Sequence, residues 1–457
     1  MTDTVYDMVI LGAGSGGYAA ALRGTQLGLT VALIEADKIG GTCLHRGCVP
    51  TKAILHSAET AEAVREAASV GVNAVFQGLD MPAVQKYKNG VVSRMRKGLE
   101  GLVASRGIEV VRGWGRLVAR DTVEVNGRRY RGRNIVLASG SFSKTIGQEI
   151  SGPVMTSDQA LELDRVPSSA VILGGGVIGV EFASAWASMG SRVTIIEGLP
   201  RLVPNEDEAV SKQLERAFRK RKIAFKTNTM FESVERTATG VTVRTADSKT
   251  YDAEVLLIAV GRGPATANLG YEEAGVAMDR GFVLTDDYGR TNVDGVWAVG
   301  DIVPGVQLAH RGFAQGIVVA EKIAGLDPRP VDDTLVPKVT FCEPEIASVG
   351  LSEAQAIEIH GAEKVTTAEF NVAGNAKSQI LGTQGFVKLV SLKDGPVVGF
   401  HAIGTRMGEQ IGEGQLIVSW EADAHDVASL VHAHPTQNET IGEAAMALAG
   451  KPLHNHG

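Results

Sequence analysis

Two of the three cysteines of the chain, Cys43 and Cys48, lie five positions apart in the segment GGTCLHRGCVPTK. Such a pair can alternate between a dithiol and a disulfide, hold a metal, or remain as two free thiols. On a regular helix their Cα atoms would be about 8–9 Å apart, whereas a disulfide tolerates at most ~7 Å. A bridge therefore requires a distorted turn, which Gly47 and Pro50 permit, and a strained bridge is easily reduced. A metal would need more Cys or His ligands than the segment supplies, so the spacing favours redox chemistry and we expect no metal.

A second segment, HAHPTQNE, places His434 and Glu439 five positions apart near the C-terminus. Histidine and glutamate can transfer protons, but these residues alone favour a structural interpretation. Thr436 and Glu439 form the T-x-x-E pattern of a capping box before a helix. A lone histidine is also more often an ordinary side chain than a catalytic one.

The elements that must hold these groups begin with a predicted strand over Tyr6–Leu11 and a helix over Tyr18–Leu27. A second strand, Thr30–Glu35, ends in an acid a few residues before the cysteines. Between the first strand and the helix, glycines occupy the G-x-G-x-x-G positions, namely Gly12, Gly14 and Gly17. Such glycines let a pyrophosphate approach the helix N-terminus, and the acid accepts hydrogen bonds from a ribose. The pattern predicts a dinucleotide beside the cysteine pair.

The same pattern returns in the middle of the chain. The strand Ala170–Leu173, the helix Val180–Met189 and the strand Arg192–Glu197 surround a second set of glycines, Gly174, Gly176 and Gly179. The acid follows the first glycine by the same number of residues in both copies. Two ordinary strand–helix turns are the alternative, but agreement in every part favours two dinucleotide sites.

The remaining chain sets the fold class and the expected boundaries. A length of 457 residues allows about three domains. The proline-rich stretch Ala324–Pro337 predicts a linker, and the mixed strands and helices after it predict an α+β domain without a nucleotide motif. We therefore expect an α/β protein with two Rossmann-like dinucleotide-binding domains and a C-terminal α+β domain. The expected bounds are 1–147 and 266–336 for the first dinucleotide domain, 148–265 for the second and 337–457 for the last.

Composition excludes several classes of function. The net charge of -7 argues against non-specific nucleic-acid binding, and no apolar run is long enough to span a membrane. The N-terminus does not resemble a signal or transit peptide, so we expect a cytoplasmic protein, or a mitochondrial matrix protein if a transit peptide has been removed. Cys342 is expected to be a small buried hydrophobe. The basic run Arg216–Lys222 is expected to be a solvated helix end.

These motifs together resemble the pyridine nucleotide–disulfide oxidoreductases, flavoenzymes of the glutathione reductase type. Three further segments support the resemblance, namely TNVDGVWAVGD from Thr291, PKVTFCEPEIASVG from Pro337 and the HAHPTQNE segment. The last two are similar to the start of the family's dimerisation domain and to its C-terminal acid–base motif. The resemblance covers nearly the whole chain.

The resemblance implies that the first unit binds FAD and the second binds a nicotinamide nucleotide, expected to be NAD. Glu35 would hold the FAD ribose, and Asp301 would meet the ribityl and phosphate region. The residues it assigns to FAD are Gly12, Gly14, Gly17, Glu35, Gly41, Thr42, Lys52, Gly115, Ser139, Gly140, Asp301, Leu308, Ala309 and His310. Those it assigns to NAD are Gly174, Gly176, Val177, Ile178, Gly179, Glu181, Glu197 and Gly261.

The resemblance also implies the catalytic roles of the polar residues. Cys43, as the more exposed thiol, would exchange with substrate, and Cys48 would lie against the flavin. Lys52 would lie near the reactive flavin nitrogen, with the carboxylate of Glu181 keeping it charged. In the acid–base motif, the histidine would act as general base and the glutamate would orient it. In the family this histidine reaches the cysteines of the partner chain, which implies a homodimer.

The nucleotide and the substrate follow from the same resemblance. The charge of Glu197 would accept a ribose 2′-hydroxyl and repel a 2′-phosphate, which favours NAD over NADP, and Arg201 is the only base nearby. With the HAHPT segment, this most resembles members that oxidise dihydrolipoyl groups on the carrier domain of a 2-oxo acid dehydrogenase or glycine cleavage complex. A glutathione-type reductase using NAD(P)H is the alternative. A redox sensor without turnover is disfavoured, because both cysteines and the acid–base pair are present.

Overall fold

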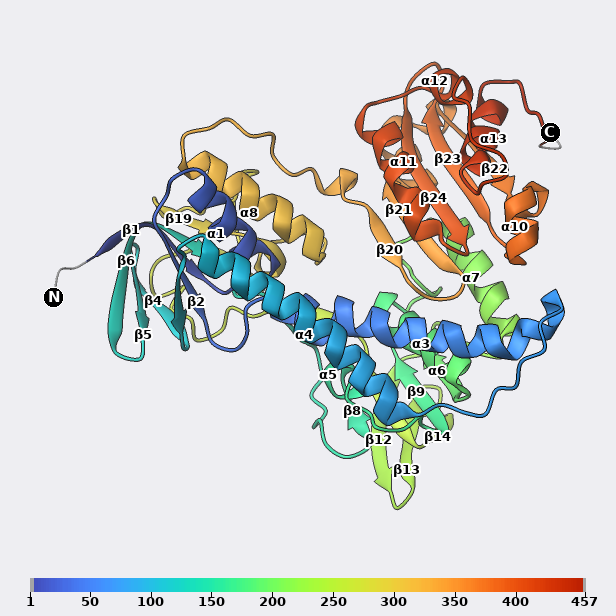
Figure 1. Cartoon of the computed structure of the whole chain (residues 1–457), viewed down its shortest axis with the longest axis horizontal. Helices are drawn as coiled ribbons and strands as arrows, with labels where there is room; N and C mark the ends of the chain where they lie inside the picture. Colours follow the sequence, from blue (N-terminus) through green and yellow to red (C-terminus); the bar gives the residue numbers. More distant parts are fainter. Residues whose placement is uncertain (1–3, 455–457) are drawn as a thin grey trace.

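The computed structural model describes residues 4–454, and Figure 1 shows three lobes. The first lobe is built on a sheet ordered β3-β2-β1-β6-β5-β4, with β19 beside β6. β1 (Val5–Leu11) lies between β2 (Val31–Glu35) and β6 (Arg128–Leu137), and both pairs are parallel. α1 (Ser15–Gln26) connects β1 to β2, so the first strand–helix–strand unit is confirmed. The other strands are β3 (Glu109–Arg112), β4 (Gly115–Ala119), β5 (Thr122–Val125) and β19 (Val296–Ala298).

α8 (Ala309–Ile323) packs directly on α1, although the two helices are far apart in the sequence (Figure 1). A Cβ atom on Gly316 would lie 2.3 Å from the carbonyl oxygen of Gly16, so only glycine permits this approach. With β19, α8 brings the chain back to the first sheet after the second lobe is complete.

The second lobe repeats the unit on a parallel sheet ordered β11-β10-β9-β15-β8. β9 (Ser169–Leu173), α6 (Val177–Met189) and β10 (Arg192–Ile196) form the predicted unit, and α6 ends at Gly190 with a φ of 107°. α6 begins at Val177 rather than at Val180, because Gly176 is its N-cap. The remaining elements are β8 (Val154–Met155), α5 (Ser157–Ala160), α7 (Glu208–Lys220), β11 (Ala224–Lys226) and β15 (Val255–Ile258), with β12 (Phe231–Thr237), β13 (Gly240–Thr245) and β14 (Thr250–Ala253) in a separate antiparallel sheet.

The first two lobes are joined by helices and by a pair of short strands. β7 (Ser141–Ser143) and β16 (Arg262–Pro264) pair antiparallel where the chain leaves the first lobe and where it returns. In Figure 1, α4 (Met81–Ser105) runs from the first lobe to the second, and α3 (Cys48–Glu66) lies along the second lobe, below the C-terminal lobe. Lys88 on α4 is buried, and its Nζ donates to the carbonyl of Leu161 at 2.9 Å. This hydrogen bond fixes α4 to the end of α5.

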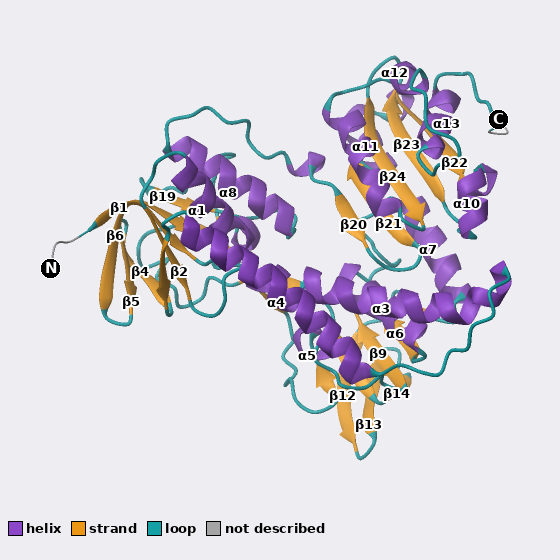
Figure 2. Ribbon diagram, viewed as in Figure 1, coloured by secondary structure: helices purple, strands orange, loops and turns teal. Residues whose placement is uncertain are grey.

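The C-terminal lobe is an antiparallel sheet ordered β20-β21-β24-β23-β22 with helices beside it, as Figure 2 shows. The segment before it contains one short 3-10 turn, Asp333–Leu335, so the predicted linker and the predicted α+β lobe are confirmed. Lys388 on β23 is buried and pairs with Asp207 at 2.9 Å, which ties this lobe to α7. Its elements are β20 (Lys338–Thr340), β21 (Glu345–Gly350), α9 (Glu353–His360), β22 (Val365–Asn371), α10 (Ala376–Leu381), β23 (Phe386–Leu392), β24 (Val397–Gly404), α11 (Met407–Ser419), α12 (Ala424–Ala428) and α13 (Glu439–Leu448).

Candidate functional site

A break in the helix brings the two cysteines together. α2 (Gly41–Arg46) stops before Gly47, whose φ of -141° and ψ of -113° are not helical, and α3 starts at Cys48. Across this break the thiol of Cys43 hydrogen-bonds the sulfur of Cys48. Both are free thiols in the structure. The distorted turn predicted at Gly47 is therefore confirmed, and the sulfurs lie close enough for dithiol–disulfide exchange.

The two sulfurs differ in charge and in exposure. The hydrogen bond from Cys43, helped by the positive charge of Lys52, lowers the pKa of Cys48 to about 7 against the opposing effect of burial. The same hydrogen bond and burial raise the pKa of Cys43, so Cys48 is the thiolate of the pair. Cys43 is half-buried, and Cys48 faces a cavity on the side where the resemblance places the flavin. That cavity lies at the start of α3, and the exchange of Cys43 with substrate stays a prediction.

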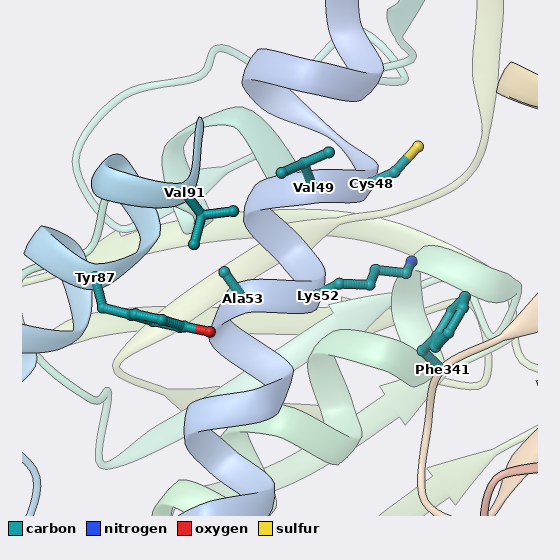
Figure 3. Close-up of a pocket in the computed structure, with 7 residues that line it drawn as sticks. All are labelled: Cys48, Val49, Lys52, Ala53, Tyr87, Val91 and Phe341. Atoms are coloured by element: carbon teal, nitrogen blue, oxygen red, sulfur yellow. The ribbon is translucent and has the colours of Figure 1, made fainter. Parts of the chain in front are cut away.

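That cavity has a volume of about 430 Å³ and is centred on α3 (Figure 3). Cys48 and Lys52 stand one turn apart on the same side of the helix, where Lys52 reaches toward Phe341. Val49 and Ala53 face α4 instead. The lining residues are Cys48, Val49, Lys52, Ala53, Tyr87, Val91 and Phe341. One wall is thus reactive and the other is apolar.

Lys52 and Glu181 form the ion pair that the resemblance implies. The Lys52 ammonium donates to both carboxylate oxygens of Glu181 at 2.9 Å. The backbone N–H of Phe341 donates to the same carboxylate at 2.9 Å, and its ring centre lies 4.6 Å from the Lys52 nitrogen. Glu181 is buried, whereas the Lys52 side chain is 33% exposed. A fixed positive charge therefore faces the cavity beside Cys48.

Gly12, Gly14 and Gly17 form the turn between β1 and α1, here called the first cradle, and its shape fits a pyrophosphate at the start of α1. A Cβ atom on Gly12 would lie 2.2 Å from the carbonyl oxygen of Ala138, and one on Gly17 would lie 1.8 Å from that of Gly12. Gly14, the N-cap of α1, receives no side-chain cap among the described residues. The carboxylate of Glu35 accepts the Ala13 N–H at 2.8 Å. Free helix N–H groups beside a strand-end carboxylate suit a phosphate and a ribose.

Other residues assigned to FAD gather at the same edge of the first sheet. Asp301 follows β19 and accepts a hydrogen bond from the Ser141 hydroxyl. Ser139 accepts the Tyr271 hydroxyl at 2.9 Å, and Gly140 follows it with a φ of 78°. Gly115 begins β4, where a Cβ atom would lie 2.5 Å from the Leu11 side chain.

Two further groups assigned to FAD lie at helix starts. Leu308 is the N-cap of α8, Ala309 is its first residue, and the His310 ring bonds the Pro337 carbonyl at 2.7 Å. Gly41 begins α2 with Thr42 next to it, and a Cβ atom on Gly41 would lie 2.6 Å from the Gly14 Cα. The cysteine helix therefore starts against the first cradle.

The second cradle repeats this geometry at the start of α6. A Cβ atom on Gly174 would lie 2.4 Å from the Ala259 carbonyl oxygen, and one on Gly179 would lie 1.9 Å from that of Gly174. A Cβ atom on Gly176 meets nothing within 4 Å, so the approach to the helix N-terminus is open there. The carboxylate of Glu197 is buried and accepts the N–H groups of Gly175 at 2.5 Å and Leu199 at 2.7 Å.

The remaining residues assigned to NAD surround this opening. Val177 and Ile178 form the first turn of α6, and Val177 is 43% exposed. Glu181, on the next turn of that helix, points to Lys52 rather than to the cradle. Gly261 has a φ of 104° and open space beside it. The backbone N–H groups at the start of α6 and the open space beside Gly176 and Gly261 fit a nicotinamide nucleotide.

His434 and Glu439 pair with each other but not with the cysteines of the same chain. Glu439 bonds the His434 Nδ1 at 2.8 Å and accepts the Thr436 N–H at 2.8 Å. The interpretation of Thr436 as a helix cap is wrong, because α13 begins at Glu439 and the Thr436 hydroxyl donates to the Ala433 carbonyl. No hydrogen bond joins His434 to either cysteine in residues 4–454, and its side chain is 72% exposed.

Sequence reasoning missed three residues near the site. Phe341 holds the Lys52–Glu181 pair, and Arg262 bonds the strand that carries Ser141. The basic run Arg216–Lys222 was expected to be a solvated helix end, and this expectation is wrong for Arg221, whose side chain is only 15% exposed. Arg221 donates to the hydroxyls of two serines on α6, to Glu62 and to the Glu343 carbonyl. No short-range pattern in the sequence marks these contacts. Cys342 is buried, as expected.

The family follows from comparison with known sequences. The pattern of the pyridine nucleotide-disulphide oxidoreductases matches residues 6–316, and the dimerisation domain of the same family matches residues 336–445. The chain belongs to this family, whose fold is of the glutathione reductase type and whose cofactors are FAD and NAD(H). The two cradles and the cysteine pair fit those cofactors. Among the described residues, no helix could cross a membrane and no cluster of His, Cys, Asp or Glu could hold a metal.

Individual relatives extend over nearly the full length of the chain. It is 37% identical to a dihydrolipoyl dehydrogenase of Bacillus subtilis, covering 99% of both chains. It is 36% identical to a mitochondrial dihydrolipoyl dehydrogenase of Arabidopsis thaliana, covering 98% of this chain and 91% of the relative. Among solved structures, LpdA of Mycobacterium tuberculosis matches with a TM-score of 0.89 and 26% identity over 96% of this chain and 99% of LpdA. RclA of Escherichia coli, an HOCl-induced flavoprotein disulfide reductase, matches with a TM-score of 0.86 and 28% identity over 96% and 99%.

Proposed function

We propose that the chain is a dihydrolipoyl dehydrogenase, which oxidises dihydrolipoyl groups to the lipoyl disulfide and reduces NAD⁺ to NADH. The observation that carries the proposal is the Cys43–Cys48 contact, with a lowered Cys48 pKa beside the charge of Lys52. Full-length similarity to curated dihydrolipoyl dehydrogenases supports the choice of substrate.

The cysteine pair accepts the two electrons of the substrate. One thiolate of the dihydrolipoyl group attacks Cys43 of the oxidised pair, which forms a mixed disulfide and releases Cys48 as the thiolate. The second substrate thiolate then displaces Cys43 and closes the lipoyl disulfide, leaving both cysteines reduced. FAD held by the first cradle beside Cys48 would supply the redox chemistry that links the reduced cysteines to NAD⁺. Lys52 holds positive charge beside Cys48 throughout.

Proton removal from the substrate is assigned to a second copy of the chain. His434 accepts the thiol proton, because thiolate and not thiol attacks a disulfide, and Glu439 orients its ring through Nδ1. Within residues 4–454 of one chain, the His434 side chain is 72% exposed and neither His434 nor Glu439 makes a hydrogen bond to the cysteines, which supports a homodimer whose sites are shared. The dimerisation domain at residues 336–445 is in keeping with that arrangement.

Glu197 supports NAD rather than NADP as the nucleotide. Its buried carboxylate carries negative charge to the edge of the second cradle, where it would repel a 2′-phosphate. Arg201 donates to the Pro204 carbonyl at 2.7 Å, so this base is already engaged.

The partner, the boundaries and the location complete the proposal. The dihydrolipoyl group would be presented by the carrier domain of a 2-oxo acid dehydrogenase or glycine cleavage complex. The FAD domain would comprise residues 1–147 and 266–336, the NAD domain 148–265 and the dimerisation domain 337–457. A cytoplasmic location stays a prediction.

Steady-state assays of two substrate pairs test the proposal. The purified protein should oxidise dihydrolipoamide with NAD⁺, and reduce lipoamide with NADH, far faster than it reduces glutathione disulfide with NADPH. Cys48→Ser should abolish turnover, whereas Cys342→Ala, which alters the buried third thiol, should keep it. The reverse substrate preference would contradict the assignment and favour a glutathione-type reductase.

A further inference from the structure

Arg262 lies at the crossing between the first and second lobes, where β7 pairs with β16. Its guanidinium makes three hydrogen bonds to β7. Nε donates to the Ser141 hydroxyl at 2.7 Å, Nη2 to the Ser141 carbonyl at 2.8 Å and Nη1 to the Ser143 hydroxyl at 3.2 Å. The rigid arginine fork can make all three bonds at once, whereas lysine cannot.

The hydroxyl of Ser141, which Arg262 holds in place, also contacts Asp301. The Ser141 hydroxyl accepts from Arg262 Nε and donates to Asp301 Oδ2 at 2.5 Å. A hydroxyl has one proton to donate, and arginine can only donate, so Arg262 directs that proton to Asp301. The Asp301 carbonyl also accepts from Gln307 Nε2 at 3.3 Å. The Gln307 bond holds only the backbone of Asp301, so the Ser141 bond is the one that orients its carboxylate, and it comes from a distant segment.

The charges around Arg262 fit this role. Burial, and to a smaller extent the positive charge of Arg46, lower the pKa of Arg262, while the negative charges of Asp301, Asp158 and Cys48 act against that lowering. Asp158 carries a buried Oδ1 that has no hydrogen-bond partner in residues 4–454. The acidic groups of both lobes therefore outnumber the neighbouring cation, Arg46, around the Arg262 guanidinium.

We propose that Arg262 is a positioning residue of the flavin site, which holds the Asp301 carboxylate through Ser141 in the orientation that receives FAD. This inference rests on the proposed assignment of Asp301 to FAD. Without the fork, Ser141 can turn its proton elsewhere and Asp301 can rotate, so FAD is held less tightly.

The test measures FAD release from the full-length holoenzyme on dilution, followed by the recovery of free-flavin fluorescence. Arg262→Met and Ser141→Ala should each raise the Kd for FAD about ten-fold, the effect of losing one hydrogen bond to a charged group. Arg262→Lys, which keeps the charge but loses the fork, should fall between. Arg129→Met, which removes a 72% exposed charge on β6, is the matched control and should leave the Kd unchanged.

A double-mutant cycle with Asp301→Asn separates positioning from a general loss of structure. Arg262→Met should add little to the Kd in that background, because the group it positions has already lost its charge. An equal ten-fold loss in both backgrounds would overturn the proposal. If Asp301→Asn itself leaves the Kd unchanged, the assignment of Asp301 to FAD fails and the inference fails with it.

The two failures are distinguishable. If Asp301→Asn weakens FAD binding but Arg262→Met and Ser141→Ala do not, the assignment stands and only the role of Arg262 is refuted. Should Arg262→Met not fold, Ser141→Ala decides alone, since it breaks the same contact with a smaller change.

Discussion

The proton shared by Cys43 and Cys48 leads to a sharp pH prediction. The hydrogen bond from Cys43, with the charge of Lys52, lowers the pKa of Cys48 from 9.0 to about 7. At pH 7 about half of the reduced protein would therefore carry the Cys48 thiolate, against about 1% for an unperturbed thiol. Because the pKa is lowered, the thiolate is present above pH 7 and is lost as the pH falls through that value.

The assay is the thiolate–flavin charge-transfer absorbance of the dithiol-reduced holoenzyme, recorded against pH. The wild-type midpoint should lie near pH 7. Cys43→Ala removes the largest cause of the shift and should raise the midpoint toward 9, and Lys52→Met should raise it less. Cys342→Ala is the control and should leave it unchanged. A midpoint that does not move in Cys43→Ala would refute the shared proton.

Three further predictions concern the acid–base pair, the buried arginine and the second cradle. His434→Gln should lower the rate of dihydrolipoamide oxidation by about 10²–10⁴-fold, and Glu439→Gln should lower it less, because the ring remains; steady-state kinetics measure both. Arg221→Ala should destabilise the protein by about 2–3 kcal/mol, because it removes several hydrogen bonds of a largely buried charge, whereas Arg219→Ala, whose side chain is 61% exposed, should change calorimetric stability little. Gly176→Ala should fold, since its Cβ meets nothing within 4 Å, yet raise the KM for NAD⁺ several-fold without loss of FAD; an unchanged KM would contradict the placement of the pyrophosphate.

Both cradles were predictable because their requirements are local. A Cβ atom at Gly17 or Gly179 would lie within 2 Å of a carbonyl oxygen five residues earlier in the chain. The spacing of glycines therefore records the turn directly in the sequence. The break at Gly47 was predictable for a similar reason, since two cysteines five positions apart cannot meet on a regular helix.

Contacts between distant segments were not predictable in this way. Phe341 reaches the Lys52–Glu181 pair only because the C-terminal lobe returns to α3 and α6. Arg221 was expected to be solvated because bases at the end of a helix match its dipole. Nothing nearby in the sequence marks the serines of α6 that it bonds. The cavity beside Cys48 has walls from three separate segments, which no local pattern brings together.

The Thr436 pattern shows how a local motif can mislead. The carboxylate of Glu439 does accept the Thr436 N–H, as a capping box requires, but the helix begins at Glu439 and the other oxygen orients His434. A structural and a catalytic interpretation thus use the same side chain, and three-dimensional placement was needed to separate them.

The central claim, that Cys43 and Cys48 carry the electron pair between substrate and nucleotide, is tested most directly by mapping thiols during one turnover. Under anaerobic conditions, one equivalent of dihydrolipoamide per chain should make both Cys43 and Cys48 open to alkylation, and NAD⁺ added before the alkylating agent should restore the bridge and protect them. Peptide mass mapping that finds the two cysteines alkylated to the same extent before reduction, after reduction and after NAD⁺ would contradict the account.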